Sequence, residues 1–370
     1  MNKERGLQAM ASKIDPVRRG FLKTVIGLAG AGTALGFTAA LAQNGPGRAA
    51  EDERNPQGGV VIPPTPALTG THLLLLGTHG GPGVDLGRAM SSSAVLVDGT
   101  PYLVDCGYGT VRNLFACGLR YAQIDTLFFT HLHNDHILDL PALLSLQWTS
   151  NKMLPTTCYG SYGTAAMVDG AKAFFAGDVG IRNADEGRTI NPDQQFQGHD
   201  LEATTKPVQV FKDDKVTVSS VENAHFPDRS RAKMPYRSLS YRFDTMERSI
   251  VFSGDTAYSG SLVELARDAD VYVSEIMDQD IYDRMEARAR EEEARGNPNS
   301  VARHVAETHS TPADVGRTAR EARVKTLVLS HLLPGTITEG RLNFPVSTFI
   351  DGVRKEFSGE IIVANDLMVI

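Results

Sequence analysis

Six residues from His131 to His136, in the order His-Leu-His-Asn-Asp-His, constrain this 370-residue chain more than any other feature. They follow directly on an apolar segment, 124–130, whose composition is typical of a buried β-strand. Residues two apart in an extended segment face the same side, so His131 and His133 can bind one metal ion. Asp135 and His136 stand where the chain leaves the strand, and they indicate a second, adjacent ion. The spacing therefore favours a metal centre over isolated structural histidines.

Further candidate ligands are His225, Asp255 and His331, because each lies just after a predicted strand. These strands are expected over 215–221, 249–252 and 326–330. Ligands at the ends of successive strands can converge on one edge of a sheet, where imidazole and carboxylate groups suit two Zn²⁺ ions bridged by an oxygen. Mn²⁺ or Fe²⁺ could take the same ligands.

Short apolar runs bounded by Gly, Asp and Pro alternate with segments of helical spacing along the chain. Other strands are expected over 72–76, 94–97, 102–104, 238–243 and 271–273, and helices over 138–148, 163–175, 262–267, 278–295 and 312–322. The mixture predicts an α/β (α+β) fold in which helices cover sheets. The helix over 278–295 is dense in Glu and Arg, and it is either a solvated helix or a lid.

The N-terminal 42 residues have the character of an export signal. Arg18-Arg19 precede a Gly- and Ala-rich, mildly apolar run that ends in small residues at 40–42. A membrane anchor is the alternative, but four glycines dilute the run. We therefore expect a twin-arginine signal peptide over 1–42, a flexible linker over 43–70 and a catalytic domain over 71–370. The mature protein would be periplasmic or secreted and would have no stable membrane anchor.

The net charge indicates which partners the chain can bind, and the cysteines indicate no catalytic site. Without residues 1–42 the chain has 31 basic and 42 acidic residues, a formal charge of −11. Such a surface supplies few cations for phosphate backbones, so nucleic acid is an unfavoured partner and a small molecule is expected; a homo-oligomer is possible. Cys106, Cys117 and Cys158 are odd in number and scattered, and we assign them no catalytic role.

The order His-x-His-x-Asp-His, a later His, Ser-Gly-Asp-Thr and a final Ser-His resembles the metallo-β-lactamase superfamily. The resemblance runs from about residue 72 to the C-terminus and implies a four-layer αββα sandwich of two similar halves. It implies that one zinc is held by His131, His133 and His225, that the other is held by Asp135, His136 and His331, and that Asp255 bridges both. The bridging aspartate argues against a typical β-lactamase.

A narrower resemblance is to the ribonuclease Z and arylsulfatase-like branch. It rests on the segments 75–78, 91–93, 274–276 and 308–311, while 159–164 and 178–182 look most similar to the zinc arylsulfatase-like members. It implies that His309 contacts the leaving group or oxyanion and that Glu275 supports it. A helix-capping role for His309 is the alternative. The chain departs from the ribonuclease pattern of this branch, because we find no Gly- and Pro-rich arm of the kind that clamps tRNA.

These observations predict an exported dinuclear zinc hydrolase that attacks small sulfate or phosphate esters with a metal-bridging hydroxide, in an arylsulfatase- or phosphodiesterase-like reaction. Asp135 would bind metal and orient the hydroxide. The alternatives are a lactonase, β-lactamase or carboxylesterase that uses the same centre, and a non-catalytic metal-binding protein. A basic cluster of Arg229, Arg231, Lys233 and Arg237 could bind an anionic ester or could be a solvated loop.

Overall fold

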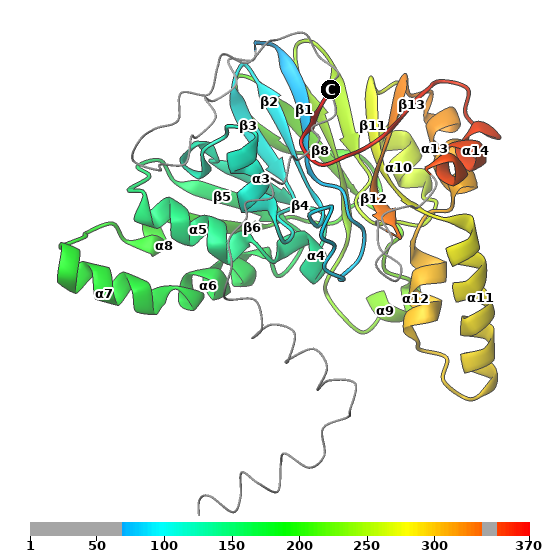
Figure 1. The fold of residues 1–370 in the computed structure, drawn as a ribbon, viewed down its shortest axis with the longest axis horizontal. Helices are drawn as coiled ribbons and strands as arrows, with labels where there is room; N and C mark the ends of the chain where they lie inside the picture. Colours follow the sequence, from blue (N-terminus) through cyan, green and yellow to red (C-terminus); the bar gives the residue numbers. More distant parts are fainter. Residues whose placement is uncertain (1–68, 335–345) are drawn as a thin grey trace, which may run out of the picture. The chain divides into compact units, whose positions relative to one another are not determined.

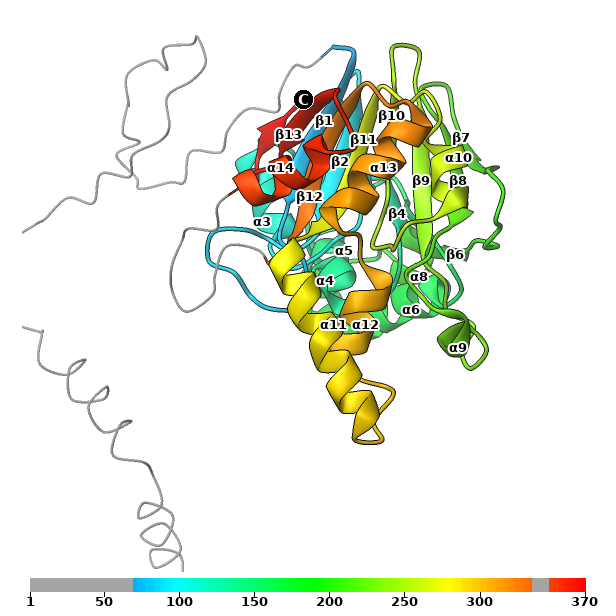
Figure 2. The ribbon, with the colours of Figure 1, turned by 90° about the vertical axis from the view of Figure 1, so that its right-hand side faces the viewer.

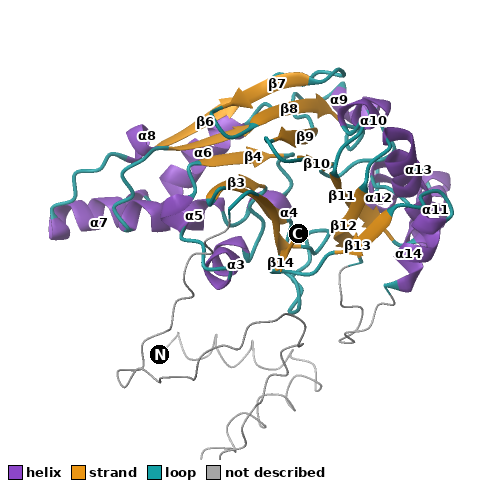
Figure 3. Ribbon diagram, turned by 90° about the horizontal axis from the view of Figure 1, so that it is seen from above, coloured by secondary structure: helices purple, strands orange, loops and turns teal. Residues whose placement is uncertain are grey.

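The structure is a computed structural model that describes residues 69–334 and 346–370. Two sheets face each other and helices cover both outer sides, so the expected four-layer αββα fold is confirmed (Figures 1 and 3). The predicted signal peptide and nearly all of the predicted linker lie outside the described residues, and the domain boundaries stay predictions. Among the described residues, no helix combines the length and the apolar character needed to cross a bilayer.

Each sheet has seven strands. The first sheet contains, in spatial order, β14 (Met368–Val369), β1 (Thr71–Gly77), β2 (Ser92–Val97), β3 (Thr100–Val104), β4 (Thr126–Phe129), β5 (Thr156–Gly160) and β6 (Phe196–Asp200). The second contains β13 (Glu360–Val363), β12 (Thr326–Leu333), β11 (Val271–Met277), β10 (Ser249–Phe252), β9 (Leu239–Asp244), β8 (Thr217–Glu222) and β7 (Val208–Lys212).

Both halves of the chain follow the same pairing pattern. The first strands of each half pair antiparallel, β1 to β3 in one half and β7 to β10 in the other. The later strands pair parallel, β3 to β6 and β10 to β13. Neighbouring parallel strands end on the same edge of their sheet, so the loops after β4, β10 and β12 can contribute side chains to one site.

Helices fill the connections between the parallel strands, and the short α9 lies between the antiparallel β8 and β9. The first half contains α3 (Thr110–Ala116), the 3₁₀ turn η2 (Tyr121–Gln123), α4 (Asn134–Ile137), α5 (Leu140–Thr149), α6 (Thr164–Phe174), α7 (Ala176–Glu186) and α8 (Pro192–Gln195). The second contains α9 (Asp228–Arg231), α10 (Gly260–Leu265), α11 (Gln279–Ala294), α12 (Val301–Thr308), α13 (Pro312–Ala322) and α14 (Ser347–Arg354). Helices α11 and α12 lie side by side and project beyond the sheets (Figures 1 and 2).

Three apolar clusters separate the four layers. Successive residues of a strand point to opposite faces of its sheet, and β1 shows this plainly. Leu74 and Leu76 pack with α5 and α6 outside the first sheet, whereas Leu73 and Leu75 pack between the two sheets. The third cluster joins the second sheet to α10, α13 and α14. These clusters pack the sheets and helices together, so the edges of the two sheets that form the site have a fixed relative position.

Candidate metal centre

Strand β4 brings the His131–His136 motif to the junction of the two sheets. The strand is buried, and just after it the backbone N–H of Leu239 on β9 donates to the carbonyl of Thr130 at 2.8 Å. His131 is wholly buried, and His133 is the N-cap residue that precedes α4. Asp135 and His136 lie in the short α4 and are buried. The change from strand to helix within six residues therefore turns four polar side chains toward one region.

The second half contributes one side chain from each of three strand ends. His225 follows β8, Asp255 follows β10 and His331 lies near the end of β12, and all three are buried. Gly254 has a φ of +59°, and a Cβ there would lie 2.9 Å from the Cβ of Thr130, so a larger residue would push Asp255 away from the motif. An irregularity in the β11–β12 pairing beside Glu275 lets both strands turn polar side chains inward.

The seven predicted ligands form two groups that share Asp255. The first ligand group is His131, His133, His225 and Asp255, and the second ligand group is Asp135, His136, Asp255 and His331. Within each group one ligand atom of every residue lies within 4.8 Å of the others. His133 Nδ1 lies 3.0 Å from His131 Nε2 and 3.1 Å from His225 Nε2. Asp255 Oδ1 lies 3.3 Å from His136 Nε2 and 3.2 Å from His331 Nε2.

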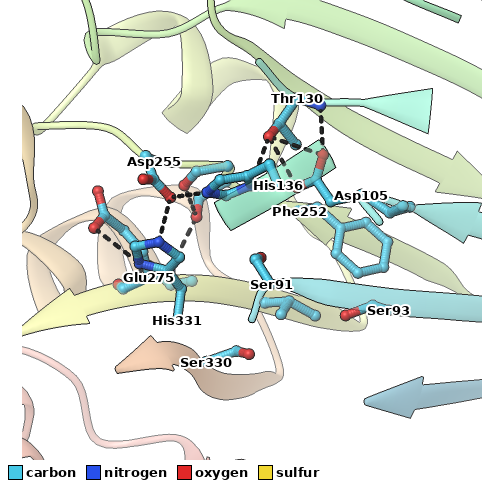
Figure 4. Close-up of a pocket in the computed structure, with 15 residues that line it drawn as sticks. Ser91, Ser93, Asp105, Thr130, His136, Phe252, Asp255, Glu275, Ser330 and His331 are labelled. Carbon is cyan, nitrogen blue, oxygen red and sulfur yellow. Dashed lines mark hydrogen bonds and ion pairs between the residues drawn. The ribbon is translucent and has the colours of Figure 1, made fainter. Parts of the chain in front are cut away.

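The chemistry of these atoms fits a pair of metal ions. His136 Nε2 and Asp255 Oδ1 are buried and have no hydrogen-bond partner among the described residues. Buried polar atoms without a partner destabilise the folded state, and a cation bound between them would remove this destabilisation. Imidazole nitrogens and carboxylate oxygens in sets of four also match the ligands and coordination number of zinc. Figure 4 shows His136, Asp255 and His331 converging on one point.

A residue that the sequence analysis did not single out, Asp105, supports the second ligand group. Its Oδ2 lies 2.8 Å from His136 Nδ1, and its Oδ1 accepts from the backbone N–H of Thr130 at 2.8 Å (Figure 4). A carboxylate on one ring nitrogen leaves the other nitrogen free to bind metal. In the first ligand group the Nδ1 atoms have neutral partners: the Thr130 hydroxyl is 3.1 Å from His131, and the Thr308 carbonyl is 3.2 Å from His225.

Burial and charge determine the protonation of the ligands. Burial among other imidazoles lowers the pKa of His131 and of His225 well below the usual value, so both rings are neutral and offer a lone pair. Burial alone would raise the pKa of Asp255, but the imidazoles of His331 and His136 outweigh it and hold that pKa well below its usual range. The carboxylate that the two ligand groups share is therefore ionised.

His309 and Glu275 form a buried pair beside the two ligand groups. His309 Nδ1 lies 2.6 Å from Glu275 Oε2, and the backbone N–H of Thr256 donates to Glu275 Oε1. Burial opposes protonation of His309, but Glu275 outweighs it and raises the pKa of His309 to about 9. The helix cap of α13 is formed instead by Thr311 with Asp314. His309 is thus held by a carboxylate; it occupies the C-cap position of α12 and does not cap α13.

His304 and His79, which the sequence analysis did not predict as ligands, also lie at the site. The His304 ring, on α12, is centred 5.2 Å from that of His225, and His79 lies beside β12, where it forms a bridge with Leu332. Burial lowers the pKa of His304 to about 4. His72 and His199 lie elsewhere: the first contacts the carbonyl of Thr69 and the second stacks on Tyr159.

Most of the basic cluster after His225 is neutralised by carboxylates. Arg229 pairs with Glu307, while Arg231 and Arg237 both pair with Glu222. These contacts remove much of the charge that would have attracted an anionic ester.

The helix predicted over 278–295 is α11, which has no buried residues and lies outside α12. The inner helix α12, and not α11, therefore borders the site.

Comparison with known proteins gives the family. A family model described as a β-lactamase superfamily domain matches residues 100–332. Ribonuclease Z of Mycobacterium bovis (strain BCG / Pasteur 1173P2) is 30% identical over 300 residues, which cover 80% of this chain and 96% of that protein. Ribonuclease Z of Mycobacterium sp. (strain KMS) is 32% identical over 262 residues, which cover 70% and 83%.

Solved structures agree on the fold. The metallo-β-lactamase fold protein YhfI from Bacillus subtilis matches with a TM-score of 0.57 at 18% identity, covering 81% of this chain and 98% of that one. The short form of human tRNase Z matches with a TM-score of 0.52 at 22% identity, covering 81% and 98%.

Two expectations from the sequence are wrong. The predicted arylsulfatase- or phosphodiesterase-like attack on small sulfate or phosphate esters is contradicted, because the relatives are ribonucleases. Part of that prediction rested on 178–182, which lie in α7, a helix with no buried residues. The prediction that nucleic acid is an unfavoured partner is contradicted by the same relatives. Net charge averages over the whole surface, whereas a nucleic acid contacts only part of it.

The family model spans residues 100–332, and the two ribonuclease Z relatives align over 96% and 83% of their own lengths. The chain belongs to the metallo-β-lactamase superfamily of metal-dependent hydrolases, in the branch that includes ribonuclease Z.

Proposed function

We propose that this protein hydrolyses phosphodiester bonds in RNA, as the name of its ribonuclease Z relatives suggests. The observation that carries the proposal is the alignment with 96% of such a relative, in a chain whose His309–Glu275 pair lies beside two ligand groups. A hydrolase that cleaves RNA must neutralise a phosphate, activate a water molecule and protonate a leaving oxygen. The described site has side chains suited to each task.

We propose that the first and second ligand groups each hold one zinc ion and share Asp255. When bound, two such ions supply Lewis-acid activation of the phosphate and of a water molecule. The proposal is supported by the fit of the donor set to zinc and by the buried atoms without partners at His136 and Asp255. Manganese or iron would fit the same ligands, so metal analysis of the purified protein must identify the ion.

The remaining chemistry is assigned to the chain's own side chains. Asp135 is fixed because its Oδ2 accepts from the backbone N–H of Gly81 at 3.1 Å, so a carboxylate oxygen can orient the attacking water and take its proton. The water oxygen forms the new bond to phosphorus as the bond to the leaving oxygen breaks. His309, protonated beside Glu275, can donate a hydrogen bond and then a proton to that leaving oxygen.

Cleavage of a tRNA precursor with a 3′ extension tests the proposal. The zinc-loaded full chain should release the extension as one product, and the same sequence made as DNA should be cleaved much more slowly or not at all. Asp135→Ala should abolish cleavage, whereas His199→Ala, on the exposed end of β6, should cleave like the wild type. Absence of cleavage of this and other RNAs by a protein that contains two zinc ions would exclude the proposed function.

We further propose that residues 1–42 direct export, which would determine the RNA that the enzyme meets. The support is the Arg18-Arg19 pair ahead of the Gly- and Ala-rich run. Cell fractionation of the full chain tests this: the wild type should be found outside the cytoplasm, and the Arg18→Lys, Arg19→Lys double variant should stay inside. Equal distribution of the two proteins would contradict export by this signal.

A further inference from the structure

His304 lies on α12, a helix that reaches the candidate metal centre from outside the two sheets. Helix α12 begins at Val301 and ends at Thr308, whose carbonyl is 3.2 Å from His225 Nδ1. His304 is four residues before Thr308, so it lies on the same face of the helix, one turn away. Helix α12 therefore presents this imidazole to the first ligand group.

The His304 ring is close to three other imidazoles. Its centroid lies 5.2 Å from that of His225, 5.6 Å from that of His133 and 5.9 Å from that of His309. One of its ring nitrogens lies within 4.8 Å of ring nitrogens of His225 and His309. The first ligand group already has four donors without it, which is a full set for zinc. A molecule bound at that group would thus lie within reach of both His304 and His309.

The His304 ring retains hydrogen-bonding capacity. Among the described residues its ring has one hydrogen-bond contact, at 3.4 Å from Nδ1 to the Thr308 hydroxyl, which is long for such a bond. The same hydroxyl donates to the His304 carbonyl at 2.7 Å. Either ring nitrogen of a neutral imidazole can carry the proton, so the ring can donate to an oxygen of a bound ligand.

Contacts at both ends of α12 fix the position of the helix that carries His304. The Ser300 hydroxyl accepts from the backbone N–H of Arg303 at 3.2 Å, capping the start of the helix. Arg303 Nε donates to Glu307 Oε1 at 2.7 Å, and Glu307 also pairs with Arg229 of α9. The helix is thus tied to the loop that follows His225. A side chain held in this way can bind a ligand at a low cost in conformational entropy.

We propose that His304 and His309 form a paired-imidazole subsite for the substrate phosphate on the side of the first ligand group, in which His304 binds a non-bridging oxygen and His309 faces the leaving oxygen. The subsite rests on the proposed function, since it takes a phosphodiester as its ligand. His304 is a positioning residue here: it holds the phosphate against His309 and transfers no proton. Loss of its ring therefore weakens binding more than it slows the chemical step.

Phosphate binding to the full, zinc-loaded chain tests this subsite directly. Inorganic phosphate is titrated by calorimetry into the wild type, His304→Ala, His304→Gln and the distant control His199→Ala, after the zinc content of each has been measured. We expect His304→Ala to bind phosphate about 3- to 10-fold more weakly, the effect of one lost hydrogen bond. His304→Gln, which keeps a donor, should recover most of the affinity. All four proteins should hold two zinc ions.

Several outcomes would overturn the subsite. These are equal phosphate affinity in the wild type and His304→Ala, no phosphate binding to the wild type, loss of zinc from both His304 variants, or a third zinc that only the wild type holds. With the RNA substrate, His304→Ala should raise KM about 3- to 10-fold at nearly constant kcat. Failure of the wild type to cleave RNA would remove the proposed function only, because the phosphate titration still decides the role of His304.

Discussion

The two ligand groups are supported in different ways. In the first, the ring nitrogens that face away from the centre meet neutral partners, as His225 does with the carbonyl of Thr308 at 3.2 Å. In the second, His136 meets the carboxylate of Asp105 at 2.8 Å. Asp105 and His331 also have positive φ values of 59° and 44°, a conformation that costs a non-glycine residue about 1–3 kcal/mol. The second group thus depends directly on the buried charge of Asp105 and on strained backbone, whereas in the first group Asp105 acts only through the Thr130 hydroxyl, which donates to Asp105 Oδ2 and lies 3.1 Å from His131 Nδ1.

Because of this difference, we expect the two ligand groups to respond separately to substitution, except at the residue that they share. Asp255 is the shared residue, since its Oδ1 is within 3.3 Å of both His136 and His331 and its Oδ2 is 3.8 Å from His131. Variants at Asp255 should affect both positions together. Variants at Asp105 should distinguish them.

The largest effect is expected from Asp255→Ala. Removal of the shared carboxylate leaves several imidazoles without the charge that holds the ions among them. We expect loss of both zinc ions and a fall in kcat/KM on the order of 10³-fold or more. Metal analysis and RNA cleavage assays measure this, with His72→Ala, far from the centre, as the control. Retention of one zinc ion at full occupancy would show that the groups are less coupled than the shared ligand implies.

His309→Ala should separate chemistry from metal binding. His309 lies outside both ligand groups and contacts Glu275, so the variant should keep both ions. Turnover should fall about 10²- to 10³-fold, the usual cost of a lost donor to developing charge. Steady-state kinetics and metal analysis of the same preparation check both parts. Full activity in this variant would reject the role assigned to His309.

Asp105→Asn tests whether the two ligand groups are supported separately. The amide keeps the size of the side chain but removes the charge behind His136. We expect the affinity of one zinc ion to fall about 10- to 100-fold, while the other ion is bound as in the wild type. Chelator competition followed by zinc titration resolves the two ions. An equal loss at both positions would contradict the separate support of the second group.

Much of the fold could be predicted because buried strands are apolar over several residues, as β4 and β10 are. The strands that were missed lie toward an edge, where the apolar signal is weak. Strand β6 contains Gly198, and a Cβ there would lie 2.6 Å from the Cα of Ala165. This glycine permits the close approach of α6 to the sheet, and the same residue makes the segment look unlike a strand.

Prediction of the site succeeded where ligands are adjacent in sequence or follow a strand, as in the His131–His136 motif. The structure brings all seven predicted ligands together, although their roles as ligands stay a proposal. Asp105 was missed because its contact with His136 joins residues 31 positions apart. His304 was missed because its role depends on where α12 packs. The polar residue directly after β3 was the available signal for Asp105, since other strand ends carry ligands.

The smallest effect is expected from Glu307→Ala, which removes the pair with Arg303 within α12 and the ion pair that joins α12 to Arg229 of α9 beside the first ligand group. The side chains of Glu307 and Arg229 are about one-third exposed, so solvent screens the pair and the free energy of unfolding should fall by only about 0.2–1 kcal/mol. Urea unfolding followed by circular dichroism measures this, with Glu286→Ala, which removes the Arg290 pair on α11, as the matched control. A loss several times larger would mean that the first group, like the second, depends on a charged support, and the contrast between the two groups would fail.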